Sequence, residues 1–105
     1  MKYGYVGRSN MIASKICLGT MHFGDRTPKE EAFAILDRAF DLGINFLDTA
    51  NVYNDGRSEE IIGEWLAQCP ARRDKLIIAT KFYGHLEPGE PNEEVGVSLY
   101  KCRRS

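Results

Sequence analysis

Three side chains of complementary chemistry follow apolar segments of this 105-residue chain. Asp48 comes directly after the apolar run 44–47, and Tyr53 follows five residues later. Lys81 ends a second apolar run, 76–80. In parallel α/β folds, the groups that do chemistry lie at or just beyond the carboxyl ends of the strands. We therefore expect a carboxylate, a phenol and an ammonium to share one edge of a sheet.

This combination of groups suits the reduction of a carbonyl. The phenol of a free tyrosine has a pKa of about 10 and is a poor proton donor at neutral pH. A nearby ammonium stabilises the phenolate, and a carboxylate beside the ammonium keeps it charged and in place. The phenol then becomes a general acid for a carbonyl oxygen. The hydride must come from a cofactor, because no side chain supplies one.

Each of these residues also has a plain structural interpretation. Asp48 could cap the turn after its strand, and Tyr53 could be a surface aromatic residue. Lys81 could be the solvated end of a strand. We favour the catalytic interpretation because three groups that tune one another fall on neighbouring units. His22 and His85 also follow strands, but we interpret both as loop residues rather than as a fourth catalytic group.

The segments around these residues alternate between strand and helix. Residues 3–6 and 11–14 flank a turn-rich tetrad, which predicts an N-terminal hairpin. Further short strands are predicted at 15–18, 44–47 and 76–79. The last of them is continuously apolar, which is typical of a strand that is buried on both faces of a parallel sheet.

Two helices are predicted between these strands. Thr27 is the expected N-cap of the first, with Pro28 at its first position and Glu30 completing a capping box. The second begins near Ser58 and ends before Pro70, which cannot continue it. Apolar residues repeat at helical spacing in both segments: Ala32, Phe33, Leu36, Ala39 and Phe40, then Ile61, Ile62, Trp65 and Leu66.

The order of strands and helices predicts an α/β fold, either a barrel or an open doubly wound sheet. The first loop lacks a G-x-G-x-x-G motif, so a Rossmann nucleotide site is disfavoured. Ser98 predicts the start of a third helix, which the chain does not complete. A closed barrel takes eight units. We therefore expect the first part of a larger fold, whose open sheet edges would allow self-association.

Composition narrows the function classes. The net charge of −1 gives no reason to expect a nucleic-acid or membrane partner, and no apolar run is long enough to span a membrane. We expect a cytoplasmic protein. The three cysteines, Cys17, Cys69 and Cys102, form no C-x-x-C pair, so neither disulfides nor a metal site are expected. We expect Cys17 to be a small buried residue and Trp65 to lie in the core.

Several motifs of the chain resemble those of one enzyme family. The sequence 43–53 reads G-I-N-F-L-D-T-A-N-V-Y, and 58–63 reads S-E-E-I-I-G. The segments L-G-T-M-H-F-G at 18–24 and L-I-I-A-T-K at 76–81 complete the set. Together they resemble the aldo-keto reductase family, in the branch of bacterial and potassium-channel-β-subunit-like members. The resemblance covers almost the whole chain.

The resemblance implies a fold, a cofactor and roles for residues. The fold would be a (β/α)8 TIM barrel with an N-terminal hairpin closing its bottom. NADPH, oxidised to NADP+, would reduce small-molecule aldehydes and ketones without a metal. Tyr53 would be the proton donor, with Lys81 and Asp48 as its tuning partners. Asp48 would also lie near the nicotinamide ribose. The residues against the nicotinamide end of the cofactor would be Gly19, Thr20 and Met21.

The same resemblance implies that parts of the family's site lie outside these 105 residues. We expect residues 1–105 to be a partial reductase domain, with about three βα units after the hairpin, cut near the start of the third barrel helix. On that expectation, this chain alone does not turn over NADPH. The alternative is a non-catalytic reductase fragment or a regulatory or binding subunit.

Overall fold

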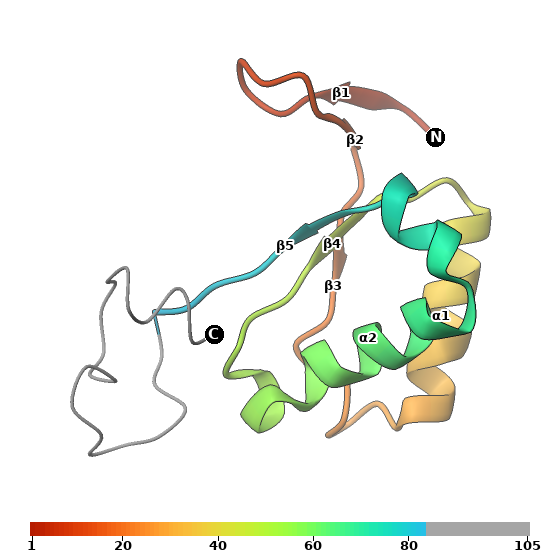
Figure 1. The fold of residues 1–105 in the computed structure, drawn as a ribbon, viewed down its shortest axis with the longest axis vertical. Helices are drawn as coiled ribbons and strands as arrows, with labels where there is room; N and C mark the ends of the chain where they lie inside the picture. The colour runs from red at the N-terminus through yellow and green to blue at the C-terminus, as the bar shows by residue number, and fades with distance from the viewer. Residues whose placement is uncertain (84–105) are drawn as a thin grey trace.

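A computed structural model describes residues 1–83 of the chain (Figure 1). Two antiparallel strands come first, followed by strands that alternate with helices and by two short 3-10 turns. In chain order the elements are β1 (Tyr3–Tyr5), β2 (Ile12–Ser14), β3 (Leu18–Gly19), α1 (Lys29–Asp41), β4 (Phe46–Asp48), η1 (Tyr53–Gly56), α2 (Arg57–Gln68), η2 (Pro70–Lys75) and β5 (Ile77–Ala79). The predicted hairpin, and the predicted order of strands and helices after it, are confirmed.

Strands β3, β4 and β5 form a parallel sheet with β4 in the middle. Its register places Leu18, Leu47 and Ile78 in one row across the sheet. The next row is formed by Gly19, Asp48 and Ala79. Because side chains alternate between the faces of a strand, these two rows point to opposite faces.

The first row faces the helices and belongs to the hydrophobic core. Leu47 is buried among residues of α1 and α2, and Leu18 and Ile78 pack partly buried against the same cluster. The two helices lie beside one another (Figure 1). Trp65 is 1% exposed and contacts the ring of Phe40 edge-on, so its predicted place in the core is confirmed. The second row, with Asp48, therefore lies on the face turned away from the core.

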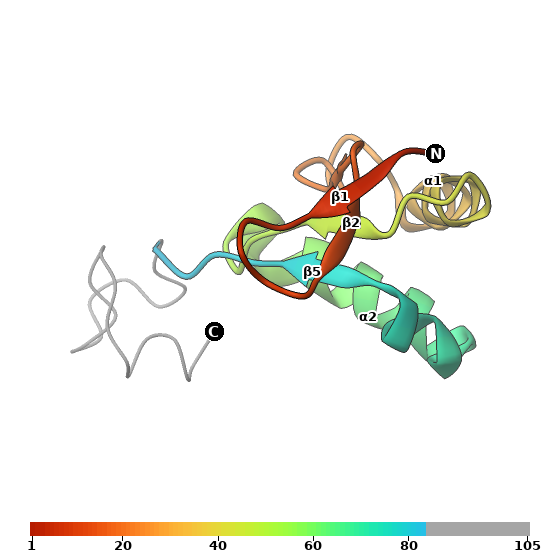
Figure 2. The ribbon, with the colours of Figure 1, turned by 90° about the horizontal axis from the view of Figure 1, so that it is seen from above.

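The N-terminal hairpin sits across the end of the sheet where its strands begin (Figures 1 and 2). Asn45, just before β4, holds it there through three hydrogen bonds. Its amide accepts from the Ser14 N–H at 2.7 Å and donates to the Ile12 carbonyl at 3.0 Å, and its own N–H bonds to the Ser14 hydroxyl. The opposite end of the sheet is left for the loops that carry the candidate site.

The predicted capping of α1 by Thr27 is wrong. Pro28 occupies the N-cap position, and no side chain caps this helix. The backbone of Thr27 is used in a tight turn instead, because its N–H bonds to the His22 carbonyl and its carbonyl accepts from Gly24. The helix therefore begins one residue later than the pattern predicts, and the carbonyl of Pro28 accepts its first bond, from Ala32.

The prediction for Cys17 is also wrong. A strand was expected over 15–18, with Cys17 buried, but β3 begins only at Leu18 and Cys17 is exposed. Residues 15–17 link the hairpin to the sheet, and β4 pairs with the chain only from Leu18 onwards. Ile16 is exposed as well, so apolar composition alone misled the prediction here.

Burial of β5 on both faces is not observed in the described part of the chain. Each residue of Ile77–Ala79 is half-buried, because α1 and α2 cover only the side that carries Ile78. The helix predicted from Ser98, together with His85 and Cys102, lies outside the described residues. Within residues 1–83, no helix is long and apolar enough to cross a membrane.

Candidate active site at the carboxyl edge of the sheet

Asp48 occupies the last position of β4, between Gly19 of β3 and Ala79 of β5. Its neighbours Leu47 and Thr49 point toward the helices, where both are buried. The alternation of side chains along the strand therefore turns the Asp48 carboxylate to the opposite face. That carboxylate lies at the carboxyl end of the sheet, as the sequence predicts.

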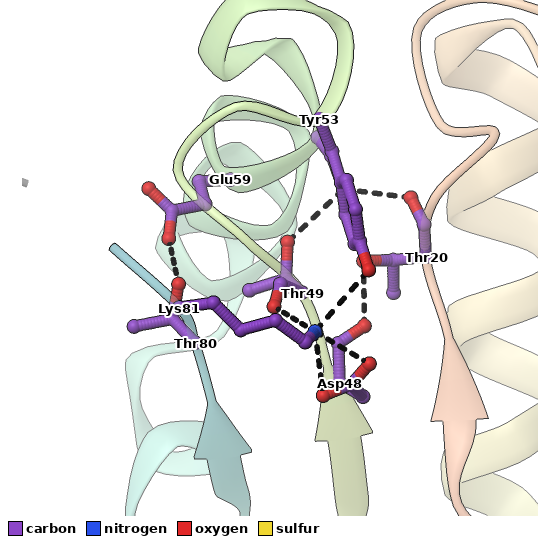
Figure 3. Close-up of polar contacts among 8 residues, drawn as sticks. Thr20, Asp48, Thr49, Tyr53, Glu59, Thr80 and Lys81 are labelled. Carbon is purple, nitrogen blue, oxygen red and sulfur yellow. Dashed lines mark hydrogen bonds and ion pairs between the residues drawn. The ribbon is translucent and has the colours of Figure 1, made fainter. Parts of the chain in front are cut away.

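Lys81 lies two residues beyond β5 and reaches back across the strand ends (Figure 3). Its ammonium nitrogen, Nζ, lies 3.0 and 2.8 Å from the two carboxylate oxygens of Asp48. It donates to the Thr49 carbonyl at 2.8 Å and lies 3.2 Å from the hydroxyl of Tyr53. The structure thus brings together all three residues that the sequence singled out for catalysis.

The Lys81 ammonium is held in its charged form. Its hydrogen bond to Asp48 is the main cause that raises its pKa above the ordinary value of 10.5, and partial burial opposes the shift. The contact with Tyr53 raises it further. The side chains of Lys81 and Asp48 are 48% and 39% exposed, so water screens much of their attraction.

Tyr53 stands at the start of η1, in the loop between β4 and α2. The centre of its ring lies 5.0 Å from the Lys81 nitrogen, close enough for a cation–π contact in addition to the hydrogen bond. The loop folds back on itself, because the Tyr53 N–H bonds to the Ala50 carbonyl. A second backbone bond, from the Asn51 N–H to the Lys81 carbonyl, joins this loop to the chain after β5.

Beneath the charged groups lies a buried cluster of three hydroxyls, which we call the hydroxyl cluster: Thr20, Thr49 and Ser58. The Ser58 hydroxyl, in the first turn of α2, lies 2.8 Å from the Thr20 carbonyl and 3.2 Å from the Thr49 hydroxyl. The Thr20 hydroxyl donates to the Asp48 carbonyl at 2.9 Å. The cluster therefore fixes the ends of β3 and β4 to the start of α2.

A cleft of about 340 Å³ opens beside Asp48 and Tyr53. It is lined by Leu18, Gly19, Thr20, Met21, His22, Phe23, Thr27, Ile35, Asp48 and Tyr53. Gly19 leaves the wall open, since a methyl group placed on it would meet no heavy atom within 4 Å. Met21 is half-exposed at this wall.

The three residues expected at the cofactor differ in how far they are exposed at this cleft. Gly19 and Met21 are exposed. Thr20 is 1% exposed, and its hydroxyl is engaged by Asp48 and Ser58. The sequence analysis did not single out the partners of Thr20. Ser58 and Thr49 lie in two of the motifs described above. The sequence signal that could have identified them is a small hydroxyl residue directly after a strand or at the start of a helix.

His22 lies exposed at the cleft, and it makes no contact with the charged groups within the described residues. Nor do residues 1–83 contain a group of three or more histidine, cysteine or carboxylate side chains able to hold a metal ion. The arrangement can hold a phenol against a fixed ammonium, beside an open, partly apolar cleft. That is suited to donating a proton to a small polar group bound there.

Comparison with known proteins identifies relatives of the chain. Residues 15–104 match the Aldo/keto reductase family. The chain is 49% identical over 110 residues to the oxidoreductase YrpG of Bacillus subtilis, covering 99% of this chain and 34% of that protein. It is 41% identical over 90 residues to an aryl-alcohol dehydrogenase [NADP(+)] of Phanerodontia chrysosporium, covering 78% of this chain and 23% of the other.

A solved structure shares the fold. The aldo-keto reductase AKR11C1 from Bacillus halodurans, in its holo form, superimposes with a TM-score of 0.73 at 38% identity, covering 86% of this chain and 28% of that one. The chain thus spans about a third or less of the length of these relatives. The predicted fold class, an N-terminal portion of a (β/α)8 barrel preceded by a hairpin, is confirmed. Sequence and structure together show that this chain belongs to the aldo/keto reductase family of oxidoreductases.

Proposed function

We propose that this chain supplies the proton donor and part of the cofactor wall of an NADPH-dependent carbonyl reductase. The observation that carries the proposal is the position of the Lys81 nitrogen, which bonds both Asp48 oxygens and lies 3.2 Å from the Tyr53 hydroxyl. An ion pair alone would not require a phenol at this place. A phenol poised on an ammonium beside an open cleft matches the needs of a general acid.

The cleft fits the nicotinamide end of a cofactor. It is open at Gly19, partly apolar at Met21, and has the Asp48 carboxylate and the Tyr53 phenol on its border. A flat ring with a polar edge and an attached ribose would find both kinds of surface here. The names of two relatives support the choice, since one is an NADP(+) dehydrogenase and the other a holo reductase.

A bound reduced nicotinamide would supply the hydride that the reaction needs. Tyr53 gives its proton to the carbonyl oxygen as the carbon gains that hydride, so the C=O double bond becomes an alcohol. Lys81 stabilises the phenolate that remains, and Asp48 keeps Lys81 charged and in place. Solvent then returns a proton to Tyr53. The substrate class is an aldehyde or ketone small enough to enter the cleft.

The catalytic roles can be tested in a chimera, in which this chain replaces the matching first third of the Bacillus subtilis relative. The measurement is NADPH oxidation with an aromatic aldehyde, and transfer of deuterium from labelled NADPH to the product carbon. We expect Tyr53→Phe to lower kcat by about 10²–10⁴-fold, the usual contribution of a general acid. Tyr5→Phe, in the exposed hairpin strand β1, is the matched control and should leave kcat unchanged.

Full activity of the Tyr53→Phe chimera would contradict the proposal. The isolated 105-residue chain is measured beside it, and we expect no turnover from it. NADPH binding by a chimera that reduces no carbonyl would instead favour the alternative, a regulatory or binding subunit.

A further inference from the structure

Two consecutive residues of the Tyr53 loop have left-handed backbone conformations. Asn54 has φ 51° and ψ 45°, and Asp55 has φ 56° and ψ 38°. Such conformations cost energy for residues other than glycine, although asparagine and aspartate tolerate them best. Two of them in a row, directly after the proposed proton donor, require contacts that hold the loop in this shape.

Asn54 makes such contacts across a long stretch of sequence. Its side-chain amide donates to the Met21 carbonyl at 2.9 Å and to the Phe23 carbonyl at 2.7 Å. An amide nitrogen has two protons, so each carbonyl receives one of them. The orientation of the side chain is fixed as well, because the flipped amide would turn its oxygen toward two carbonyl oxygens.

The two segments that Asn54 joins carry different halves of the proposed site. Met21 and Phe23 belong to the loop after β3, which lines the cleft. Tyr53, the residue before Asn54, lies beside Lys81. Asp55 shares the unusual backbone, but within residues 1–83 its carboxylate makes no hydrogen bond to the 21–23 loop.

We propose that Asn54 is a positioning residue that couples the cleft wall at residues 21–23 to the phenol of Tyr53. A ring that binds against Met21 would then also hold Tyr53 in place against Lys81. This inference rests on the proposed function for the identity of the ligand, a nicotinamide. The coupling itself depends only on the two hydrogen bonds of Asn54.

Asn54→Gly, compared with a matched control, separates the two hydrogen bonds from backbone strain. Glycine adopts positive φ freely, so this change relaxes the backbone and also removes the two side-chain hydrogen bonds. Asp55→Gly is the matched control, because it relaxes the neighbouring residue of the same conformation and removes no bond to the 21–23 loop. Asn54→Asp is the second variant, since it keeps the shape of the side chain but replaces both donors with an oxygen.

The experiment uses NMR on the full 105-residue chain, labelled in methionine methyl groups and tyrosine rings, with the fluorescence of Trp65 as a check of folding. Without ligand, we expect nuclear Overhauser contacts between the Tyr53 ring and the Lys81 side chain in the wild type and in Asp55→Gly. In Asn54→Gly and Asn54→Asp, the population with this contact should fall by about tenfold, as expected for the loss of two neutral hydrogen bonds.

The second arm is a titration with reduced nicotinamide mononucleotide. In the wild type and in Asp55→Gly, the probe should shift the signals of both Met21 and Tyr53, but in Asn54→Gly only that of Met21. An Asn54→Gly chain that keeps the Tyr53–Lys81 contact would overturn the inference, as would a wild-type chain without it. Failure of the probe to shift Met21 in any chain would count against the proposed cofactor site, and the ligand-free contacts would still decide the role of Asn54.

Discussion

The hydroxyl cluster and the charged groups above it both join the ends of neighbouring elements, but by different interactions. The hydroxyl cluster fixes the ends of β3 and β4 to the start of α2, and the charged groups join the end of β4 to the chain after β5. The two groups meet at consecutive residues, Asp48 and Thr49. The three hydroxyls are almost fully buried, whereas Asp48 and Lys81 are well exposed. Neutral hydrogen bonds therefore operate out of water, while the ion pair operates partly within it.

The difference separates stability from chemistry. Buried neutral groups cost free energy when a partner is lost, because water cannot replace it. An exposed ion pair contributes little to stability, but its charges stay accessible to a ligand in the cleft. The hydroxyl cluster therefore stabilises the fold, and the charged groups remain accessible to a ligand in the cleft.

Removing Ser58 from the hydroxyl cluster should have the largest effect on stability. Ser58→Ala leaves the Thr20 carbonyl and the Thr49 hydroxyl without this partner in a site that excludes water. We expect a loss of about 1–3 kcal/mol in the free energy of unfolding. The measurement is urea unfolding followed by Trp65 fluorescence.

Ser9→Ala is the control for that experiment. The Ser9 hydroxyl also donates to a backbone carbonyl, that of Val6, but in the turn of the hairpin, where Ser9 is only partly buried. Its removal should change the free energy of unfolding by less than about 0.5 kcal/mol. Equal losses for both serines would mean that burial of the hydroxyl cluster does not matter.

Removing the ammonium should affect stability less. Lys81→Met keeps the length of the side chain and removes its charge, and we expect a loss of about 0.2–1 kcal/mol. In 1 M salt the Debye length falls to about 3 Å, so the loss should shrink, whereas that of Ser58→Ala should not. In the chimera, the same change should raise the activation free energy calculated from kcat by far more than it lowers the free energy of unfolding. A loss in stability as large as that of Ser58→Ala would erase the contrast between the two groups.

High pH should reveal the smallest effect. The pKa of Lys81 is raised in the folded state, so its contribution to stability is fully present below its unfolded pKa, about 10.5. It is lost as the pH rises through the higher folded pKa. The difference in free energy of unfolding between wild type and Lys81→Met should therefore be constant near neutral pH and diminish above pH 10.5. A difference that grows in this range would contradict the sign of the shift.

The sequence predicted the charged groups better than it predicted the hydroxyl cluster. Asp48, Tyr53 and Lys81 could be found because strand ends and residue types are visible in the sequence. The roles of Thr49 and Ser58 in the hydroxyl cluster were not predicted, because hydroxyl residues are common in loops and at helix starts. Their role depends on which backbone carbonyls the fold brings beneath them, and a pattern of residue types does not contain that information.

Errors in the fold had a similar origin. The segment 15–18 has the composition of a strand, but strand pairing depends on what lies beside it, and β4 reaches only Leu18. Thr27 and Pro28 have the residue types of a helix start, but the turn over 22–27 uses the Thr27 backbone first. In the first case a missing strand partner, and in the second a local backbone turn, overrode the preference of the residue types.

The position of Asp48 between two buried neighbours also protects the pairing of the central strand. A slip of β4 by one residue would turn its carboxylate toward Leu36 and Trp65 and move Leu47 to the open face. Burying an unpaired carboxylate in an apolar core is among the costliest changes a fold can suffer. Asp48 therefore acts against misaligned sheets during folding, before any ligand or substrate is present. The residue proposed to tune the reaction therefore also helps to fix the register of the central strand.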